Sequence, residues 1–220
     1  MMKTYKILSA LLAYPEPDLL ENAGALAAAL AGETLLPAVH RDAVAGFIGD
    51  LGRQDVLDAQ EAYVALFDRN RSLSLHLYEH VLGESRDRGQ AMVELARLYQ
   101  QHGYDVSAAE LPDYLPLFLE FLSLLPAGEA AELLSRAVHV VAALKEKLDE
   151  RGSPYAVPMA AVEALAASRA DAGEVAAVRE TLTGRDDSLE QLDRQWEEEA
   201  VRFAGATGPD AASLAAGCGR

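Results

Sequence analysis

Residues 62–89 read AYVALFDRNRSLSLHLYEHVLGESRDRG, and the interpretation of the whole chain depends on this stretch. Apolar residues at helical spacing alternate in it with a dense group of ionisable side chains. The stripe Leu73, Leu77 and Val81 predicts a short helix that ends at Gly83. The same periodicity recurs before and after this stretch, without any alternating strand pattern. We therefore expect a fold made of helices.

Composition also favours an all-α fold. The chain has 220 residues, half of them apolar, which is enough to bury the core of one domain. Ala, Leu and Glu are abundant, while aromatic and β-branched residues are scarce, and helices prefer that balance. The spacing of apolar residues predicts a single-domain helical bundle of about nine to ten helices. This domain is expected to span residues 1–204, followed by a disordered Gly/Ala-rich tail at 205–220.

Capping residues predict several helix starts. Asp18 and Glu21 have the spacing of a capping box ahead of an Ala-rich helix. Asp55 and Ser85 each precede a segment with helical periodicity, and Ser188 opens the last predicted helix. The helices between these starts are amphipathic, as expected for elements that surround one core.

Charge, cysteine content and hydropathy exclude several classes of protein. A formal charge of −16 argues against nucleic-acid binding, which requires clustered Lys and Arg. The single cysteine, Cys218, has no partner for a disulfide or a Cys-based metal site. The run that holds Leu8, Leu11 and Leu12 is short and interrupted, which predicts a core helix rather than a signal peptide. No apolar run approaches the roughly 20 residues of a membrane span. We expect a cytoplasmic protein with no stable membrane insertion.

The pentad HLYEH at residues 76–80 has two interpretations. In one, His76 and His80 lie one turn apart on a helix and bind a metal, and Glu79 acts as the base of a hydrolase. The sequence defines no third ligand and no strand-rich peptidase framework, so this is the less favoured alternative. In the other, both histidines are partly buried, hydrogen-bonded helix residues. We expect no metal.

Arginines around the same stretch could bind a phosphate-bearing cofactor, because guanidinium binds phosphate in bidentate fashion. Acidic residues interleaved with them nearly cancel their charge, which favours local ion pairs. The basic group is Arg69, Arg71, Arg86 and Arg88, and the acidic group is Asp68, Glu79, Glu84 and Asp87. No glycine-rich phosphate loop and no nucleophile beside a base is visible. The sequence therefore predicts no catalytic residue and no resident cofactor.

The segment LPLFLEFLSLL, residues 115–125, is apolar on nearly every face of a helix. Asp113 is the predicted N-cap of this helix. Pro116 then falls in the first turn, where its missing N–H is one the helix could not use. Such a helix is either central to the core, which is the default, or lines a groove for a peptide.

Two long segments in this order resemble the NarJ family of nitrate reductase molybdenum cofactor assembly chaperones. They are LFDRNRSLSLHLYEHVLGESRDRGQAMVELARLYQQHGYDV at 66–106 and ELPDYLPLFLEFLSLLP at 110–126. YKILSALLAYP at 5–15 and LSRAVHVVAALKEKLDERGSPYA at 134–156 are similar to that family too. The resemblance extends from about Tyr5 to Phe203.

The resemblance implies the all-helical fold of molybdoenzyme maturation chaperones (TorD/DmsD/NarJ-like) and a role without catalysis. It implies binding to the N-terminal segment of the apo nitrate reductase catalytic (alpha) subunit. That binding would support molybdenum cofactor insertion and delay docking to the membrane subunit. Molybdenum cofactor delivery proteins are further expected partners. The alternative client is another molybdoenzyme.

Related chaperones carry a Glu-Pro-x-Asp-His-type stretch. Residues 110–114 here, ELPDY, keep an acid, the proline and the aspartate but have tyrosine in place of histidine. By the resemblance, a peptide groove lies beside this stretch and the HLYEH pentad. The predicted peptide-binding residues are His76, Tyr78, Glu79, His80, Asp113, Tyr114, Leu117 and Glu120. Acidic members of this set, such as Glu79, Asp113 and Glu120, are expected to orient basic side chains of an amphipathic client helix.

Overall fold

Helices make up nearly all of the regular structure. A computed structural model describes residues 2–83, 85–106 and 110–183, and within these ranges the chain forms twelve α-helices and no strand. The prediction of an all-α fold is confirmed, with slightly more helices than expected. The helices are α1 (Lys3–Leu12), α2 (Pro17–Glu21), α3 (Ala23–Ala31), α4 (Ala38–Leu51), α5 (Val56–Tyr63), α6 (Leu77–Leu82), α7 (Arg86–Gln101), α8 (Leu115–Leu122), α9 (Ala127–Ser135), α10 (Val138–Glu150), α11 (Ala156–Ala164) and α12 (Ala172–Thr183).

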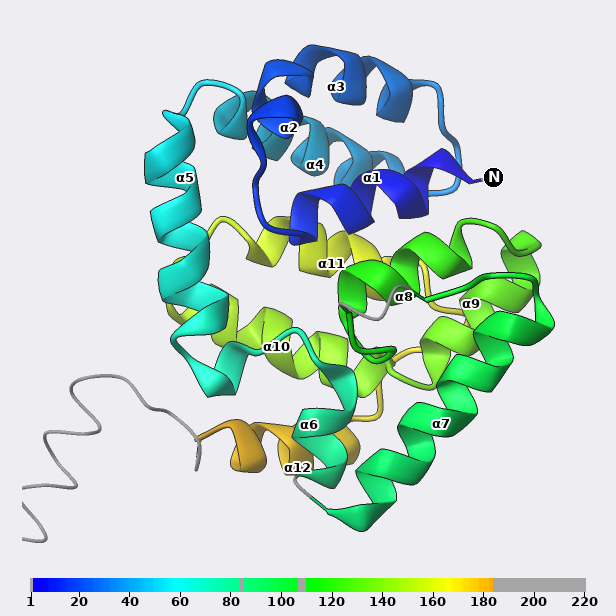
Figure 1. The fold of residues 1–220 in the computed structure, drawn as a ribbon. Helices are drawn as coiled ribbons and strands as arrows, with labels where there is room; N and C mark the ends of the chain where they lie inside the picture. Colours follow the sequence, from blue (N-terminus) through cyan, green and yellow to red (C-terminus); the bar gives the residue numbers. More distant parts are fainter. Residues whose placement is uncertain (1, 84, 107–109, 184–220) are drawn as a thin grey trace, which may run out of the picture. The chain divides into compact units, whose positions relative to one another are not determined.

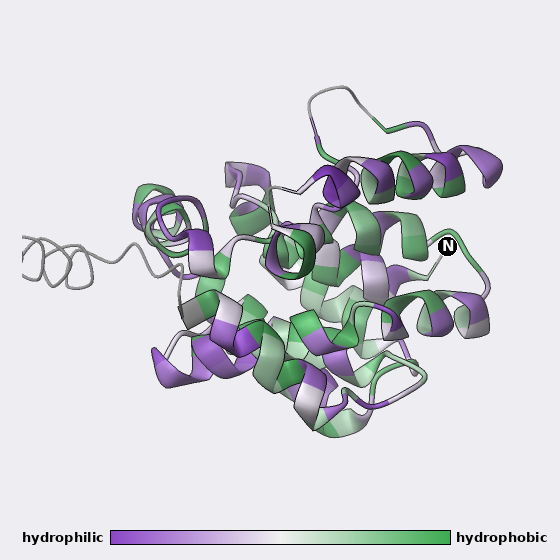
Figure 2. Ribbon diagram, turned by 90° about the horizontal axis from the view of Figure 1, so that it is seen from below, coloured by the Kyte–Doolittle hydropathy of each residue, from purple (hydrophilic) through white to green (hydrophobic). Residues whose placement is uncertain are grey.

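The apolar helix α8 is the centre of the core, as its sequence predicted. Figure 1 shows α8 in the middle of the bundle with α1 beside it. Six of its eight residues are buried. Figure 2 shows hydrophilic and hydrophobic residues alternating along the helices, as expected where each helix turns one face to the core. A helix buried on nearly all sides fixes the positions of its neighbours.

Polar contacts hold α1 against α8. The Ser9 hydroxyl donates a buried hydrogen bond of 2.7 Å to the carbonyl oxygen of Pro116. The Lys6 ammonium lies 2.6 Å from Glu120 Oε1. The buried side chains of α1 include Leu8, Leu11 and Leu12, so the N-terminal run is a core helix, as predicted.

Two predicted helices are interrupted. The Ala-rich helix expected after Asp18 is divided at Asn22 into α2 and α3, and Asp18 lies inside α2 rather than capping it. The Asn22 side-chain amide donates to the carbonyl oxygen of Asp18 (2.8 Å). Asn side chains compete in this way with the backbone bonds of a helix, so the prediction of one helix was wrong.

The second interruption lies in residues 62–89. A π-helical turn, η1 (Val64–Asp68), and a 3₁₀ turn, η2 (Arg71–Leu73), precede an extended segment, and α6 begins only at Leu77. The Asn70 side chain accepts from the Ser72 N–H and so caps η2. One helix through Leu73, Leu77 and Val81 was therefore a wrong prediction, and Val81 is 52% exposed.

The two remaining capping predictions within the described residues have different outcomes. Asp55 caps α5, where its carboxylate accepts from the Leu57 N–H at 2.9 Å. Ser85 occupies the N-cap position of α7 but makes no capping hydrogen bond with its side chain. The helix predicted after Ser188 and the domain end at residue 204 lie outside the described residues. None of the described helices is long and apolar enough to cross a membrane.

Candidate functional site

Two segments far apart in the sequence meet where α6 and α8 begin. The Leu77 N–H donates to the carbonyl oxygen of Asp113 (3.0 Å), and the Leu115 N–H donates to that of Leu75 (2.8 Å). These bonds form a short antiparallel bridge between His76 and Tyr114. The bridge joins the two segments that the sequence placed at one site. It also explains the interruption before α6, because a backbone paired in this way is extended.

Asp113 is the centre of this junction. Its side chain is 0% exposed, and Oδ2 accepts from the Tyr78 N–H at 3.1 Å. Oδ1 lies 3.2 Å from Nδ1 of His76, and an Arg88 guanidinium nitrogen lies 3.7 Å from Oδ2. The Tyr78 N–H belongs to the first turn of α6 and has no partner within that helix. Asp113 therefore caps α6 from a distant part of the chain.

The predicted role of Asp113 as the cap of α8 was wrong. Tyr114 is the N-cap residue of α8, and its side chain makes no capping hydrogen bond. The first turn of α8 needs little capping, because Pro116 has no N–H and the Leu115 N–H is taken by the bridge to Leu75. The Asp113 carboxylate is thus available to accept from the Tyr78 N–H in the first turn of α6.

The two histidines of the HLYEH pentad do not share a helical face. His76 is the extended N-cap residue of α6, and its ring faces Asp113. His80 is 1% exposed, and its Nε2 lies 2.6 Å from the carbonyl oxygen of Ser74. Glu79 accepts from the Ser74 hydroxyl at 3.0 Å and lies 3.6 Å from Nε of Arg71. Over the described ranges, no three His, Cys, Asp or Glu residues are grouped to hold a metal ion. The geometry required by the metal-hydrolase alternative is not formed.

The remaining predicted residues face other parts of the bundle. The Tyr63 hydroxyl donates to the carbonyl oxygen of Leu12 at 3.0 Å, so the Tyr114 hydroxyl, 3.1 Å away, donates to Tyr63. Burial raises the pKa of Tyr63 far above its usual range, and Tyr114 raises it further. Leu117 is half-buried on α8, and Glu120 faces Lys6 on α1. The eight predicted residues therefore do not form one continuous surface.

A half-enclosed cavity of about 410 Å³ lies between α6, α7, α8 and α9. Among the eight predicted residues, Tyr78 alone lines it. Its apolar lining is Leu77, Leu95, Leu98, Phe118, Leu133 and Ala137, and its polar lining is Tyr78, Glu94, Arg97, Gln101 and Arg136. The amphipathic stripe of α7, with Leu95 and Tyr99 on its buried face, was the available sequence signal for one wall. Nothing in the sequence placed α9 opposite that wall.

Tyr78 is one of the polar residues that line the cavity. Its pKa is raised, first by burial and then by the negative charges of Asp113 and Glu94, while Arg136 opposes the increase. The phenol therefore stays protonated at neutral pH and can donate a hydrogen bond to a bound group. The backbone N–H of the same residue is held by Asp113, which couples the cavity to the junction.

The wall formed by α7 is attached mainly at its C-terminal half. Leu95 and Tyr99 are its buried residues, and the Tyr99 hydroxyl donates to the carbonyl oxygen of Pro112 (2.7 Å). Gly83 before the helix and Gly103 after it have φ of 60° and 71°, a region in which other residues are strained. At the far end, Nε2 of His102 lies 3.1 Å from Glu129 Oε1 on α9. That contact links the two walls of the cavity.

Comparison with known proteins places this architecture in a family. Residues 17–161, which include the junction and the cavity, match the family model described as nitrate reductase delta subunit. The chain belongs to the nitrate reductase delta subunit family. It is similar to the nitrate reductase molybdenum cofactor assembly chaperone NarJ of Escherichia coli K12, with 45% identity over 197 residues, 90% of this chain and 83% of the relative.

Two further relatives of this delta-subunit-family chain carry similar names. The probable assembly chaperone NarW of Escherichia coli K12 is 38% identical over 204 residues, covering 92% of this chain and 84% of the relative. The probable NarJ of Bacillus subtilis is 32% identical over 121 residues, covering 53% of this chain and 66% of the relative. The resemblance to the NarJ family is confirmed. These relatives are named as chaperones, which supports the prediction that the chain is not an enzyme.

Proposed function

We propose that this chain is a cytoplasmic assembly chaperone for a nitrate reductase. It binds the N-terminal segment of the apo catalytic subunit, keeps that subunit competent for molybdenum cofactor insertion, and delays its docking to the membrane subunit. The observation that carries the proposal is the similarity to NarJ over nearly the whole chain, with 45% identity across 90% of it. The cavity between α6 and α9 is the proposed binding site for the client segment.

The cavity has the lining that an amphipathic helix requires. Five apolar side chains from four helices and Ala137, which follows α9, surround it, and α7 and α9 form its two walls. A helix that lays its apolar stripe between two such walls is a common form of peptide recognition. Burial of apolar surface contributes about 25 cal/mol per Å² in gross transfer energy. Ordering of the peptide offsets part of that gain.

The predicted peptide-binding residues take different roles in this proposal. Tyr78 lines the cavity and contacts the client directly. Asp113 and His80 are buried, so they act by holding the start of α6 in place. His76 and Tyr114 cross the bridge beside them. We propose that these four residues set the position of Tyr78 rather than touch the client.

The other three residues of the predicted set do not line the cavity. Glu79 and Glu120 already contact Arg71 and Lys6, respectively, and Leu117 lies half-buried on α8. Their proposed contribution is to the edge of the client interface, where contacts exclude water and add little affinity individually.

Calorimetric titration tests the proposal. The full chain is titrated with a synthetic peptide that copies the first few dozen residues of the nitrate reductase catalytic subunit encoded beside it. We expect saturable binding of one peptide per chain with a negative change in heat capacity. Tyr78→Ser and Leu98→Ser, both in the cavity, should each weaken binding about tenfold or more. Leu57→Ser, at an exposed position on α5, is the control and should leave affinity unchanged.

Two outcomes would contradict the proposal at different points. If the peptide does not bind the unmodified chain, the N-terminal segment of the catalytic subunit is not its client. Full binding by folded Tyr78→Ser and Leu98→Ser variants would keep the client and move its site away from the cavity.

A further inference from the structure

The carboxylates expected to orient a basic client are already engaged within the chain. Glu120 is paired with Lys6 at 2.6 Å. Asp113 is fully buried and holds the start of α6. Glu79 accepts from the Ser74 hydroxyl and lies beside a guanidinium group. None of these three residues lines the cavity. The electrostatic character of the proposed site must therefore come from other side chains.

The cavity itself has a cationic lining in a strongly acidic chain. Arg97 projects from α7, and Arg136 follows the last residue of α9 on the opposite wall. Neither guanidinium forms an ion pair with any residue that the structure describes. Glu94 is the one carboxylate in the lining, and its Oε1 accepts from the Gln90 side chain at 2.9 Å. The cavity lining thus contains two arginines and one carboxylate, which gives it a net positive charge. The whole chain, by contrast, has a formal charge of −16.

We propose that the cavity selects a client helix that carries an Asp or Glu next to its apolar stripe, and that Arg97 and Arg136 bind this carboxylate. The inference rests on the proposed function and specifies in addition that the client helix carries an acidic residue. The apolar lining receives the stripe, while the arginines on the two walls meet the acid at its border. Guanidinium groups suit this role, because they bind carboxylates in bidentate geometry and are weakly hydrated.

The choice of a carboxylate follows from the surroundings of the two arginines. A carboxylate is the anionic group that an unmodified protein segment carries, and the apolar side chains beside the arginines call for a ligand with a large apolar body. Protonated Tyr78 adds a neutral hydrogen-bond donor to the cavity lining. Arg97, Arg136 and Tyr78 can all donate hydrogen bonds to an anion, and a Lys or Arg of the client would be repelled by the two arginines.

A double-mutant cycle between chaperone and peptide tests the inference. The chaperone variants are Arg97→Gln and Arg136→Gln, and the peptide variants replace each Asp or Glu in turn by Asn or Gln. Each arginine substitution should weaken binding of the unmodified peptide about tenfold. The same substitutions should change binding of the correct amide-substituted peptide less than about twofold, because the partner charge is already absent.

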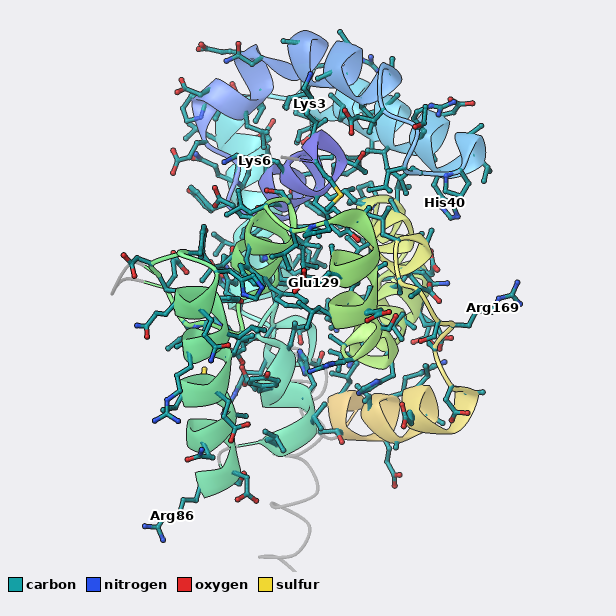
Figure 3. All side chains as sticks on the ribbon, turned by 90° about the vertical axis from the view of Figure 1, so that its right-hand side faces the viewer. Lys3, Lys6, His40, Arg86, Glu129 and Arg169 are labelled. Atoms are coloured by element: carbon teal, nitrogen blue, oxygen red, sulfur yellow. The ribbon has the colours of Figure 1, made fainter. Side chains whose placement is uncertain are left out.

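Arg86→Gln is the matched control. It removes the same charge from the same helix, and Figure 3 shows the Arg86 side chain at the far end of α7, pointing away from the other helices. Its effect should be below about twofold and should disappear as salt screens long-range attraction. The effects of Arg97→Gln and Arg136→Gln should persist at the same salt concentration.

Failure of the inference can be separated from failure of the proposed function. If the unmodified chain does not bind the peptide, both are wrong. If the peptide binds but both arginine variants retain full affinity, or lose it equally for acidic and amide peptides, the inference alone is wrong. Tight binding of a client segment without any Asp or Glu would also overturn it. So would saturable binding of inorganic pyrophosphate at these arginines with no effect of either arginine on the peptide.

Discussion

Asp113 shows how one side chain can organise two helices. Its carboxylate accepts from the Tyr78 N–H and lies beside His76 and Arg88, while its backbone carbonyl accepts from the Leu77 N–H. Asp113→Ala leaves the Tyr78 N–H without its acceptor and removes the negative charge that lies 3.7 Å from the Arg88 guanidinium. We expect a loss of about 2–4 kcal/mol in the free energy of unfolding, measured by urea denaturation. The Tyr78 amide should also exchange with solvent faster.

Asp105→Ala provides the comparison at this scale. Asp105 is exposed in the loop after α7, so its removal should change the free energy of unfolding by less than about 0.5 kcal/mol. Equal small effects of the two substitutions would show that Asp113 does not hold the start of α6.

At the scale of single residues, the sequence indicated which segments come together but not which contacts their side chains make. The segments around His76 and Asp113, which the sequence predicts to lie at one site, meet in the structure. The role of Asp113 could not be predicted, because the N–H that it caps lies 35 residues away, and capping rules read only neighbouring positions. Arg97 and Arg136 were missed because an exposed arginine on or just after an amphipathic helix carries no local signal.

At the scale of elements, α7 and α9 are linked by a histidine that responds to pH. Nδ1 of His102 lies 3.0 Å from the carbonyl oxygen of Leu98, and Nε2 lies 3.1 Å from Glu129 Oε1. Both oxygens only accept, so both ring nitrogens donate when the imidazole is protonated. The hydrogen bond to Leu98 raises the pKa of His102 above its ordinary value of 6.5, and Glu129 raises it further.

The sign of the resulting pH dependence follows from that direction. Because the pKa of His102 is raised in the folded state, the stabilisation from its contacts with Leu98 and Glu129 is fully present below pH 6.5. That stabilisation is lost as pH rises through the folded-state pKa. His102→Gln should remove this part of the slope of stability against pH. His40→Gln, on α4, should leave it in place. An NMR titration of the His102 ring that gives a pKa at or below 6.5 would contradict the assignment.

Elements were predictable where periodicity and capping were local. The positions of α1 and α5 and the central place of α8 followed from the sequence, because apolar spacing decides which face is buried. The start of α6 did not, since the backbone at His76 is extended by pairing with Tyr114. A tertiary contact here overrides the helical preference of the segment, and local pattern cannot show it.

At the scale of the whole molecule, a client helix should stabilise the chaperone fold. The cavity takes residues from four helices, so a ligand that binds it favours the folded state over the unfolded chain. A ligand at 100 times its Kd adds about 2.7 kcal/mol. For a chain of this length, that corresponds to a rise in Tm of roughly 5–11 °C. Thermal unfolding followed by circular dichroism, with and without the client peptide, measures the shift.

The variants in the cavity make this prediction specific. Arg97→Gln should reduce the shift at fixed peptide concentration, because a tenfold weaker Kd removes about 1.4 kcal/mol of the stabilisation. Arg86→Gln should preserve the shift, since that side chain points away from the bundle (Figure 3). A peptide that binds in calorimetry but leaves Tm unchanged would have equal affinity for folded and unfolded chains, which a site built from four helices does not allow.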